Sequence, residues 1–293
     1  MMDAADAAPP VVRAQSFELV NATGETRAVL GTLDDVPLLG FVDASGVHRA
    51  ALLLDTDGSP GIFLRDQDAQ VRASLYLNDG SPTLGLQQAE DGGHIEACID
   101  DAGARIVLQD RNDTIRAALT MGATGQPALL LQDAGGAIRL RAGLDDDDGT
   151  PTLSLQDTGS DPRAVLSLRP DGTPVLHLHD EFGQLRLSVD VNADGTPALV
   201  LRDDEGKASL VIAGLAASPA VSVHDPSGTL RATMGVVDGT PAILTINAEG
   251  DRSTTVDAVM ERGRDNPSIQ AQGEAVTRLI AALQDFVASL GPS

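Results

Sequence analysis

Residues 171–189 read DGTPVLHLHDEFGQLRLSV, and this stretch decides the fold because the chain repeats it. It contains two segments in which apolar and polar residues alternate, separated by a turn signature that begins at Asp180 and ends at Gly183. Alternation with a period of two predicts strands with one apolar face. Asp and Gly at these positions predict a tight turn, because Gly readily adopts a positive φ. The stretch therefore predicts a β-hairpin.

The hairpin unit recurs every 22 to 24 residues. Proline marks the same position in most copies, at residues 37, 60, 82, 127, 151, 174, 197, 219 and 241. Ala104 and Gln15 take this position in two further copies, which gives eleven units between about residue 11 and residue 250. The consensus is P-x-L-x-L-x-D-x-x-G-x-x-R-A-x-L-x-L, followed by Asp-Gly-Thr or Asp-Gly-Ser. A period of this length is typical of tandem supersecondary repeats.

The loop lengths predict an antiparallel meander with one apolar face. A three-residue loop of Asp57, Gly58 and Ser59 places Leu54 opposite Ile62, and the hairpin before it keeps the same parity. We therefore expect the leucine positions on a buried face. The outward positions are polar in most copies, namely Arg65, Gln87, Gln109, Gln132, Gln156, His179, Arg202 and His224.

A sheet with one apolar face needs a cover. Three arrangements supply it: a meander that coils on itself, a parallel β-solenoid with one coil per unit, and a trimeric β-prism, in which three chains pack their apolar faces together. The chain has no Trp, one Tyr and five Phe, so the core is aliphatic and suits a narrow interior. We predict an all-β fold of eleven tandem hairpins and favour the trimeric prism, with the solenoid as the alternative.

The ends of the chain differ from the repeats. We expect a disordered arm over residues 1–10, the repeat shaft over 11–250, a linker over 251–272 and an amphipathic helix over 273–290. Apolar residues in this helix are spaced by four and three, at Val276, Ile280, Leu283, Val287 and Leu290. Such spacing is typical of a coiled-coil seam. The helix is predicted to align copies of the chain, and the alternative is a helix that folds back on the last repeat.

Possible metal ligands cluster at His177, His179 and Asp180. Because His179 is one rung of the outward polar series and Asp180 is the repeated turn residue, we predict no metal site here. The acidic turns at Asp55 and Asp57 and at 145–148 are interpreted as turn geometry, because calcium loops need more ligands at fixed offsets. Calcium binding is the alternative that stays open.

Nothing in the sequence predicts catalysis. Nucleophile-elbow, phosphate-loop and dinucleotide motifs are absent, and the one cysteine, Cys98, lies in an alternating segment that suggests a small buried side chain. We therefore predict a protein that is not an enzyme, with no catalytic, cofactor-binding or metal residues and no cofactor.

The formal net charge of −23 argues against binding to nucleic acid or to an anionic membrane surface. The sequence shows neither a signal peptide nor an apolar run of about 18 residues. The prediction is a cytoplasmic, virion-associated or appendage-associated protein.

The units at 171–189 and 194–212 (DGTPALVLRDDEGKASLVI) resemble the tandem DG-x-P-x-L-x-L-x-D-x-x-G-x-x-R repeats of uncharacterised bacterial and phage proteins. They are also loosely similar to the hairpin repeats of phage tail fibres and Rhs-type shells. The resemblance covers about 240 residues, is carried by turn and core positions, and implies a fold but no activity.

Three functions compete. We expect a non-enzymatic structural fibre or scaffold, a homo-oligomeric shaft such as that of a phage tail fibre or surface appendage. The alternative is a repeat binding module that recognises a periodic polymer such as a polysaccharide, or a protein. A hydrolase acting on such a polymer would need paired carboxylates in a cleft.

Overall fold

The computed structural model describes residues 11–33, 35–88, 92–122, 124–145, 147–214, 219–237, 240–254 and 277–281. The all-β meander is confirmed, because the strands pair with their neighbours along the chain and every pair is antiparallel. The solenoid alternative is wrong for the same reason. The chain divides into two compact units, residues 1–128 with 134–136 and residues 129–133 with 137–293.

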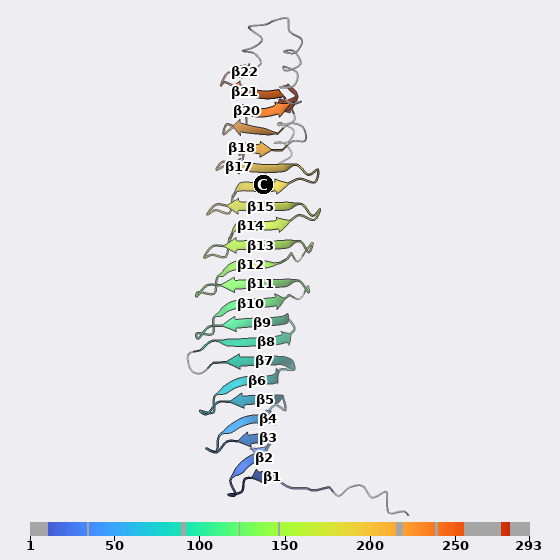
Figure 1. Ribbon diagram of the computed structural model, residues 1–293, viewed down its shortest axis with the longest axis vertical. Helices are drawn as coiled ribbons and strands as arrows, with labels where there is room; N and C mark the ends of the chain where they lie inside the picture. The colour runs from blue at the N-terminus through green and yellow to red at the C-terminus, as the bar shows by residue number, and fades with distance from the viewer. Residues whose placement is uncertain are drawn as a thin grey trace, which may run out of the picture. The chain divides into compact units, whose positions relative to one another are not determined.

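Unit 1 is an open meander (Figure 1). Its strands are β1 (Ser16–Val20), β2 (Thr26–Leu33), β3 (Val36–Val42), β4 (His48–Leu54), β5 (Pro60–Arg65), β6 (Val71–Asn78), β7 (Ser81–Gln87), β8 (His94–Asp100), β9 (Gly103–Gln109) and β10 (Ile115–Met121). The strand β11 (Pro127–Gln132) spans the boundary between the two units.

Unit 2 repeats this arrangement (Figure 1). Its strands are β12 (Ile138–Leu144), β13 (Pro151–Gln156), β14 (Pro162–Leu168), β15 (Pro174–His179), β16 (Leu185–Val191), β17 (Pro197–Arg202), β18 (Ala208–Ala213), β19 (Ala220–His224), β20 (Leu230–Val237), β21 (Thr240–Ile246) and β22 (Arg252–Thr254). A short helix covers residues 277–281. The strand β22 lies in the segment that we expected to be a linker, and the arm at 1–10 lies outside the described residues.

The turn at Asp180 shows how the sequence closes each hairpin. The amide of Asp180 donates to the carbonyl of Gln184 at 2.9 Å, and the amide of Gly183 donates back to the carbonyl of Asp180 at 3.1 Å. The Asp180 carboxylate also accepts hydrogen bonds from the amides of Phe182 (2.9 Å) and Gln184 (3.0 Å). Gly183 has a φ of 78°, a region that side chains disfavour. Asp and Gly are therefore required by the turn itself.

The turns between hairpins close one residue earlier than expected. The amide of Asp55 donates to the carbonyl of Ser59 at 2.8 Å, so Ser59 is paired and the loop begins at Thr56. Leu54 consequently lies opposite Pro60, and the predicted pair of Leu54 with Ile62 is wrong by two residues. A shift of two residues preserves the face of every side chain, so the predicted parity holds.

The side of the sheet that carries the leucines is called the leucine face. In unit 1 it holds two rows that run from strand to strand. The central row is Phe17, Leu30, Leu39, Leu52, Ile62, Leu75, Leu84, Ala97, Ile106 and Leu119. The second row is Leu19, Ala28, Phe41, Ala50, Leu64, Ala73, Leu86, Ile95, Leu108 and Ala117.

The other side, called the mixed face, alternates small and long side chains. In unit 1 its central row is Val29, Gly40, Ala51, Phe63, Ser74, Gly85, Glu96, Val107 and Ala118. Long side chains lie over the small residues: a Cβ added to Gly40 would lie 2.7 Å from Nδ1 of His48. Val107 in this row is buried, at 3% exposure.

Within a single chain the leucine face is not buried, and the described residues do not supply the cover that we expect for it. Leu30 is 54% exposed and Leu52 is 48% exposed, whereas the mixed-face residues Ala51 and Ala118 are buried. The reason is that the single-layer meander places no described residues of its unit over the leucine face.

The helix at 277–281 packs on the mixed face of unit 2. Ile280 (5% exposed) joins Leu230, Ala242 and Leu244 in one apolar cluster. Leu279 comes so close to Gly235 that an added Cβ there would lie 3.2 Å from its Cδ2. These residues support the fold-back alternative, because Ile280 is buried within its own chain. The other expected seam residues lie outside the described part of the chain.

Candidate interaction surface

The leucine face is the largest apolar feature of the described residues. Its two rows in unit 1 contain no charged residue, and most of their large side chains are between one third and two thirds exposed. Exposed contiguous apolar patches on monomeric proteins rarely exceed a few hundred Å², and larger ones mark interaction sites.

Each unit has an apolar hollow at an equivalent place on this face. In unit 1 the hollow has a volume of about 480 Å³ and lies between the central row, at Leu84 and Ile106, and a third row that includes Pro82 and Met121. In unit 2 a hollow of about 660 Å³ lies between Leu199, Ile212 and Val221 on one side and Pro197 and Pro241 on the other. The prolines that mark the repeat therefore form one wall of a groove on the leucine face.

Charge is concentrated at the hairpin turns, along the edge of this face. In many of the hairpin repeats, the turn Asp forms an ion pair with the Arg six residues further along the chain. The pairs are Asp43–Arg49, Asp66–Arg72, Asp110–Arg116, Asp133–Arg139, Asp157–Arg163, Asp180–Arg186 and Asp225–Arg231. These pairs confirm the surface pairing that the repeated Asp and Arg positions indicate.

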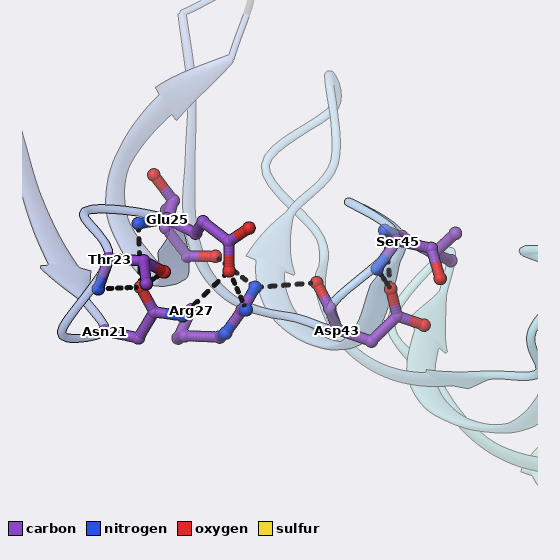
Figure 2. Close-up of polar contacts among 8 residues, drawn as sticks. Asn21, Thr23, Glu25, Arg27, Asp43 and Ser45 are labelled. Atoms are coloured by element: carbon purple, nitrogen blue, oxygen red, sulfur yellow. Dashed lines mark hydrogen bonds and ion pairs between the residues drawn. The ribbon is translucent and has the colours of Figure 1, made fainter.

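Several arginines also donate to a main-chain carbonyl of the next hairpin, namely Arg27, Arg49, Arg139, Arg163, Arg186 and Arg231. Figure 2 shows the first example, in which Nη1 of Arg27 donates to the carbonyl of Asp43 at 3.2 Å, sixteen residues along the chain. In this turn Asn21 replaces Asp and accepts the amide of Thr23 at 3.0 Å, while Glu25 supplies the ion pair to Arg27. The side chain of Asp43 accepts the amide of Ser45 at 2.8 Å in the next turn (Figure 2).

The two histidines lie together on the mixed face. The ring centroids of His177 and His179 are 6.0 Å apart and the rings meet edge to face. Burial lowers the pKa of His177, and the neighbouring His179 and Arg169 lower it further. With Gln184, Asp204 and Glu205 they line a polar hollow of about 540 Å³. The sequence places both histidines outward, but it does not show that the rings touch.

The outward series is not outward throughout. His224 is 9% exposed, and its Nε2 lies 3.0 Å from Oγ of Ser222. The sequence misses this burial because the last repeats keep the same alternation as the rest, and only tertiary packing distinguishes them.

The candidate metal ligands lie in separate places in the part of the chain that the structure describes. Within it, no group of three or more His, Cys, Asp or Glu side chains is arranged to hold a metal ion. The carboxylates of Asp57 and Asp148 each accept an amide two residues ahead, from Ser59 and Thr150. Cys98 is a buried free thiol whose pKa is raised by burial. None of the described helices is long and apolar enough to cross a membrane.

No family model and no curated protein matches the chain. Among solved structures, the TCP domain of SAS-4 (dCPAP) from Drosophila melanogaster, in complex with a proline-rich motif of Ana2 (dSTIL), is similar at 14% identity, 63% coverage of this chain, 96% coverage of that chain and a TM-score of 0.29. The wild-type TCP10 domain of Danio rerio CPAP is similar at 17% identity, with 66% of this chain and 92% of that chain covered and a TM-score of 0.22. The TcdB2-TccC3-Cdc42 structure is similar at 10% identity, with 81% of this chain and 18% of that chain covered and a TM-score of 0.16. TM-scores this low establish neither a shared fold nor a shared function.

Proposed function

We propose that the protein is a non-enzymatic structural scaffold that assembles with further copies of itself through the leucine face. The observation that carries the proposal is the pair of uncharged, half-exposed aliphatic rows. A catalytic or small-ligand protein would not need the same exposed side chains in every repeat, whereas a shaft does. A trimeric β-prism, as in a phage fibre or surface appendage, is the assembly we favour.

The leucine face of unit 1 is large enough to support a stable interface. Its ten strands lie about 4.8 Å apart, and three side-chain rows about 7 Å apart give an area of roughly 1,000 Å². Stable protein interfaces bury about 800 Å² on each partner. Unit 1 alone therefore offers the area that a permanent contact requires.

A second copy fits this face better than an unrelated partner does. Two copies present rows with the same strand spacing, and face-to-face sheets pack about 10 Å apart with their side chains interdigitated. The groove between the central row and the third row, which includes Pro82 and Met121, would receive the partner's aliphatic side chains. Because the acidic residues lie at the turns, they would remain solvated at the rim.

Net charge tunes this association. At a formal charge of −23 per chain, copies repel one another at long range, and salt screens that repulsion. We expect assembly to strengthen as ionic strength rises, which is the opposite of an interface held by ion pairs.

Sedimentation with multi-angle light scattering on the full chain tests the proposal. The wild type should have the mass of two or more chains. For the prism, this mass should be that of three chains or a multiple of three. The Leu52→Asp/Leu75→Asp variant should fall to a smaller species with its β-sheet circular dichroism retained. Gln87→Asp, on the mixed face, is the matched control and should keep the wild-type mass. A wild type with the mass of one chain, or equal masses for the leucine-face variant and the wild type, would overturn the proposal.

A further inference from the structure

The outer edge of β1 is a second surface, separate from the leucine face. We propose that two copies of the chain pair edge to edge through β1 (Ser16–Val20), antiparallel across a two-fold axis. This inference does not depend on assembly through the leucine face, because it uses backbone groups at the edge of the sheet.

Among the described residues, β2 is the strand that pairs with β1, and none pairs with the outer edge of β1. All five residues of the strand are exposed, and its pairing in unit 1 is with β2 on one side. Residues 11–15, just before the strand, are exposed as well, and Figure 1 shows them leaving the sheet. An exposed edge strand presents unpaired amide and carbonyl groups that template pairing with another strand.

Two of the usual protections of an edge strand, proline and lysine, are absent from β1, whose sequence is SFELV. The single charge, Glu18, lies on the mixed face, where it accepts a hydrogen bond from the hydroxyl of Thr26 at 2.9 Å. On the leucine face Phe17 is 48% exposed and Leu19 is 65% exposed. The apolar rows therefore continue into β1, the first strand of the described sheet, without a polar end.

A second copy of β1 is the partner that continues these rows. In a two-fold pair centred on a residue, opposed residues have the same parity, so both leucine faces lie on one side. A pair centred on Phe17 places Glu18 opposite Ser16 of the other copy, which avoids opposing two glutamates. It also stacks the two Phe17 rings against each other on the leucine face.

Pairing of this kind closes on itself. Each β1 edge is used by the other copy. The last described strand, β22 (Arg252–Thr254), is only three residues long and offers little edge for further growth. A two-fold contact with no free equivalent gives a discrete dimer instead of a filament. Two prismatic trimers would meet head to head through three such pairs.

The first test uses Leu52→Asp/Leu75→Asp as the background, so that association through the leucine face is removed. Sedimentation of this full-length variant should show twice the mass of one chain at high protein concentration. A species of one chain's mass at every concentration overturns the edge pairing and leaves the leucine-face proposal untouched.

A charge swap across the two-fold axis supplies the second test. In the same background, Phe17→Lys and Phe17→Glu should each raise the dimer dissociation constant at least tenfold, because like charges then face each other. Mixing the two variants should restore a one-to-one dimer. Leu30→Lys and Leu30→Glu, one strand inward on the same row, are the controls and should leave the dimer intact. Dimers that persist in both Phe17 variants, or an equal loss in the Leu30 variants, contradict the proposal. Circular dichroism verifies that each variant is folded.

Discussion

Arg139 donates a hydrogen bond from Nε to the main-chain carbonyl of Gln156 at 3.0 Å, although the two residues belong to consecutive hairpins. The same guanidinium reaches Asp133 of its own turn, with Nη1 3.3 Å from Oδ2. Arg49 makes the equivalent pair of contacts, to Arg65 O at 2.9 Å and to Asp43 at 3.2 Å. Each of these two arginines therefore joins its own turn to the following hairpin.

Removal of one such connection should lower stability slightly. Arg139→Gln loses a charged donor to Gln156, but the pair is well exposed and screened, so we expect the melting temperature to fall by only about 1–3 °C. Arg111→Gln, at an exposed turn position, is the control and should leave the melting temperature unchanged. Differential scanning calorimetry measures both. An equal fall in the two variants would show that the loss is unspecific.

Three of the turns that resemble the Asp180 turn carry a side chain where the geometry favours glycine. Ala69, Asp113 and Ser160 have φ values of 62°, 60° and 68° at the position that holds Gly183 in another repeat. Ala69→Gly should therefore raise the free energy of unfolding by about 0.5–1 kcal/mol, because a left-handed alanine is strained.

Ala44→Gly is the matched control for this change. Ala44 lies in the equivalent kind of turn but is not among the residues with positive φ, so glycine there should lower stability through the entropy of the unfolded chain. Urea denaturation compares the two variants. The same sign of change for both would contradict the role of backbone strain.

The turn carboxylates make stability depend on acid. Hydrogen bonds from Ser227, together with Arg231, lower the pKa of Asp225 to about 2. Because this folded-state pKa lies below the ordinary value of 3.8, the carboxylate contributes stability above about pH 4. That contribution is lost as the pH falls from about 4 towards 2.

Asp225→Asn should flatten this part of the pH profile. Asn already serves in two turns, where Asn21 accepts the amide of Glu25 at 2.9 Å and Asn247 accepts the amide of Asp251 at 2.8 Å. The variant should thus fold at neutral pH with a modest loss of stability. Thermal melts at pH 2, 3, 4 and 7 measure the slope, and an unchanged slope would mean that Asp225 does not contribute to it.

The repeat was readable from the sequence because its signals are local. Alternation and the spacing of Asp180 and Gly183 determine the hairpins, and the Asp–Arg pairs follow from the same spacing. The exact pairing of Leu54 depended on a backbone hydrogen bond of Asp55, which residue identity does not reveal. Which face is buried was harder to predict, because alternation distinguishes two faces but does not say which one is covered. The position of Ile280 depends on contacts with residues some 40 positions earlier in the chain, such as Ala242 and Leu244. The apolar spacing within the helix does not encode these contacts.

Neighbouring residues on β9 test the assignment of the two faces. Val107→Asp places a charge at a site that is 3% exposed on the mixed face and should destabilise the fold by about 3 kcal/mol or more. Ile106→Asp lies on the leucine face at 43% exposure and should cost much less within one chain. Chemical denaturation of both variants under conditions that keep them monomeric gives the comparison. Equal losses would indicate that the leucine face is buried inside the single chain.

Variants of the helix at 277–281 distinguish between two predictions for the C-terminal segment: a seam that aligns copies of the chain and a helix that folds back on its own chain. Ile280 packs against Leu230, Ala242 and Leu244 of its own chain, whereas its neighbour Ala281 is exposed. Ile280→Asp would bury a charge in this cluster, so the helix should detach from the mixed face. We expect hydrogen exchange at residues 277–281 to increase strongly, with the β content and the assembled mass unchanged. Ala281→Asp, one residue further along the helix, should leave the exchange as in the wild type. If Ile280→Asp instead lowered the assembled mass while residues 277–281 stayed protected, Ile280 would belong to a seam between copies and the fold-back contact would not be the one that matters in solution.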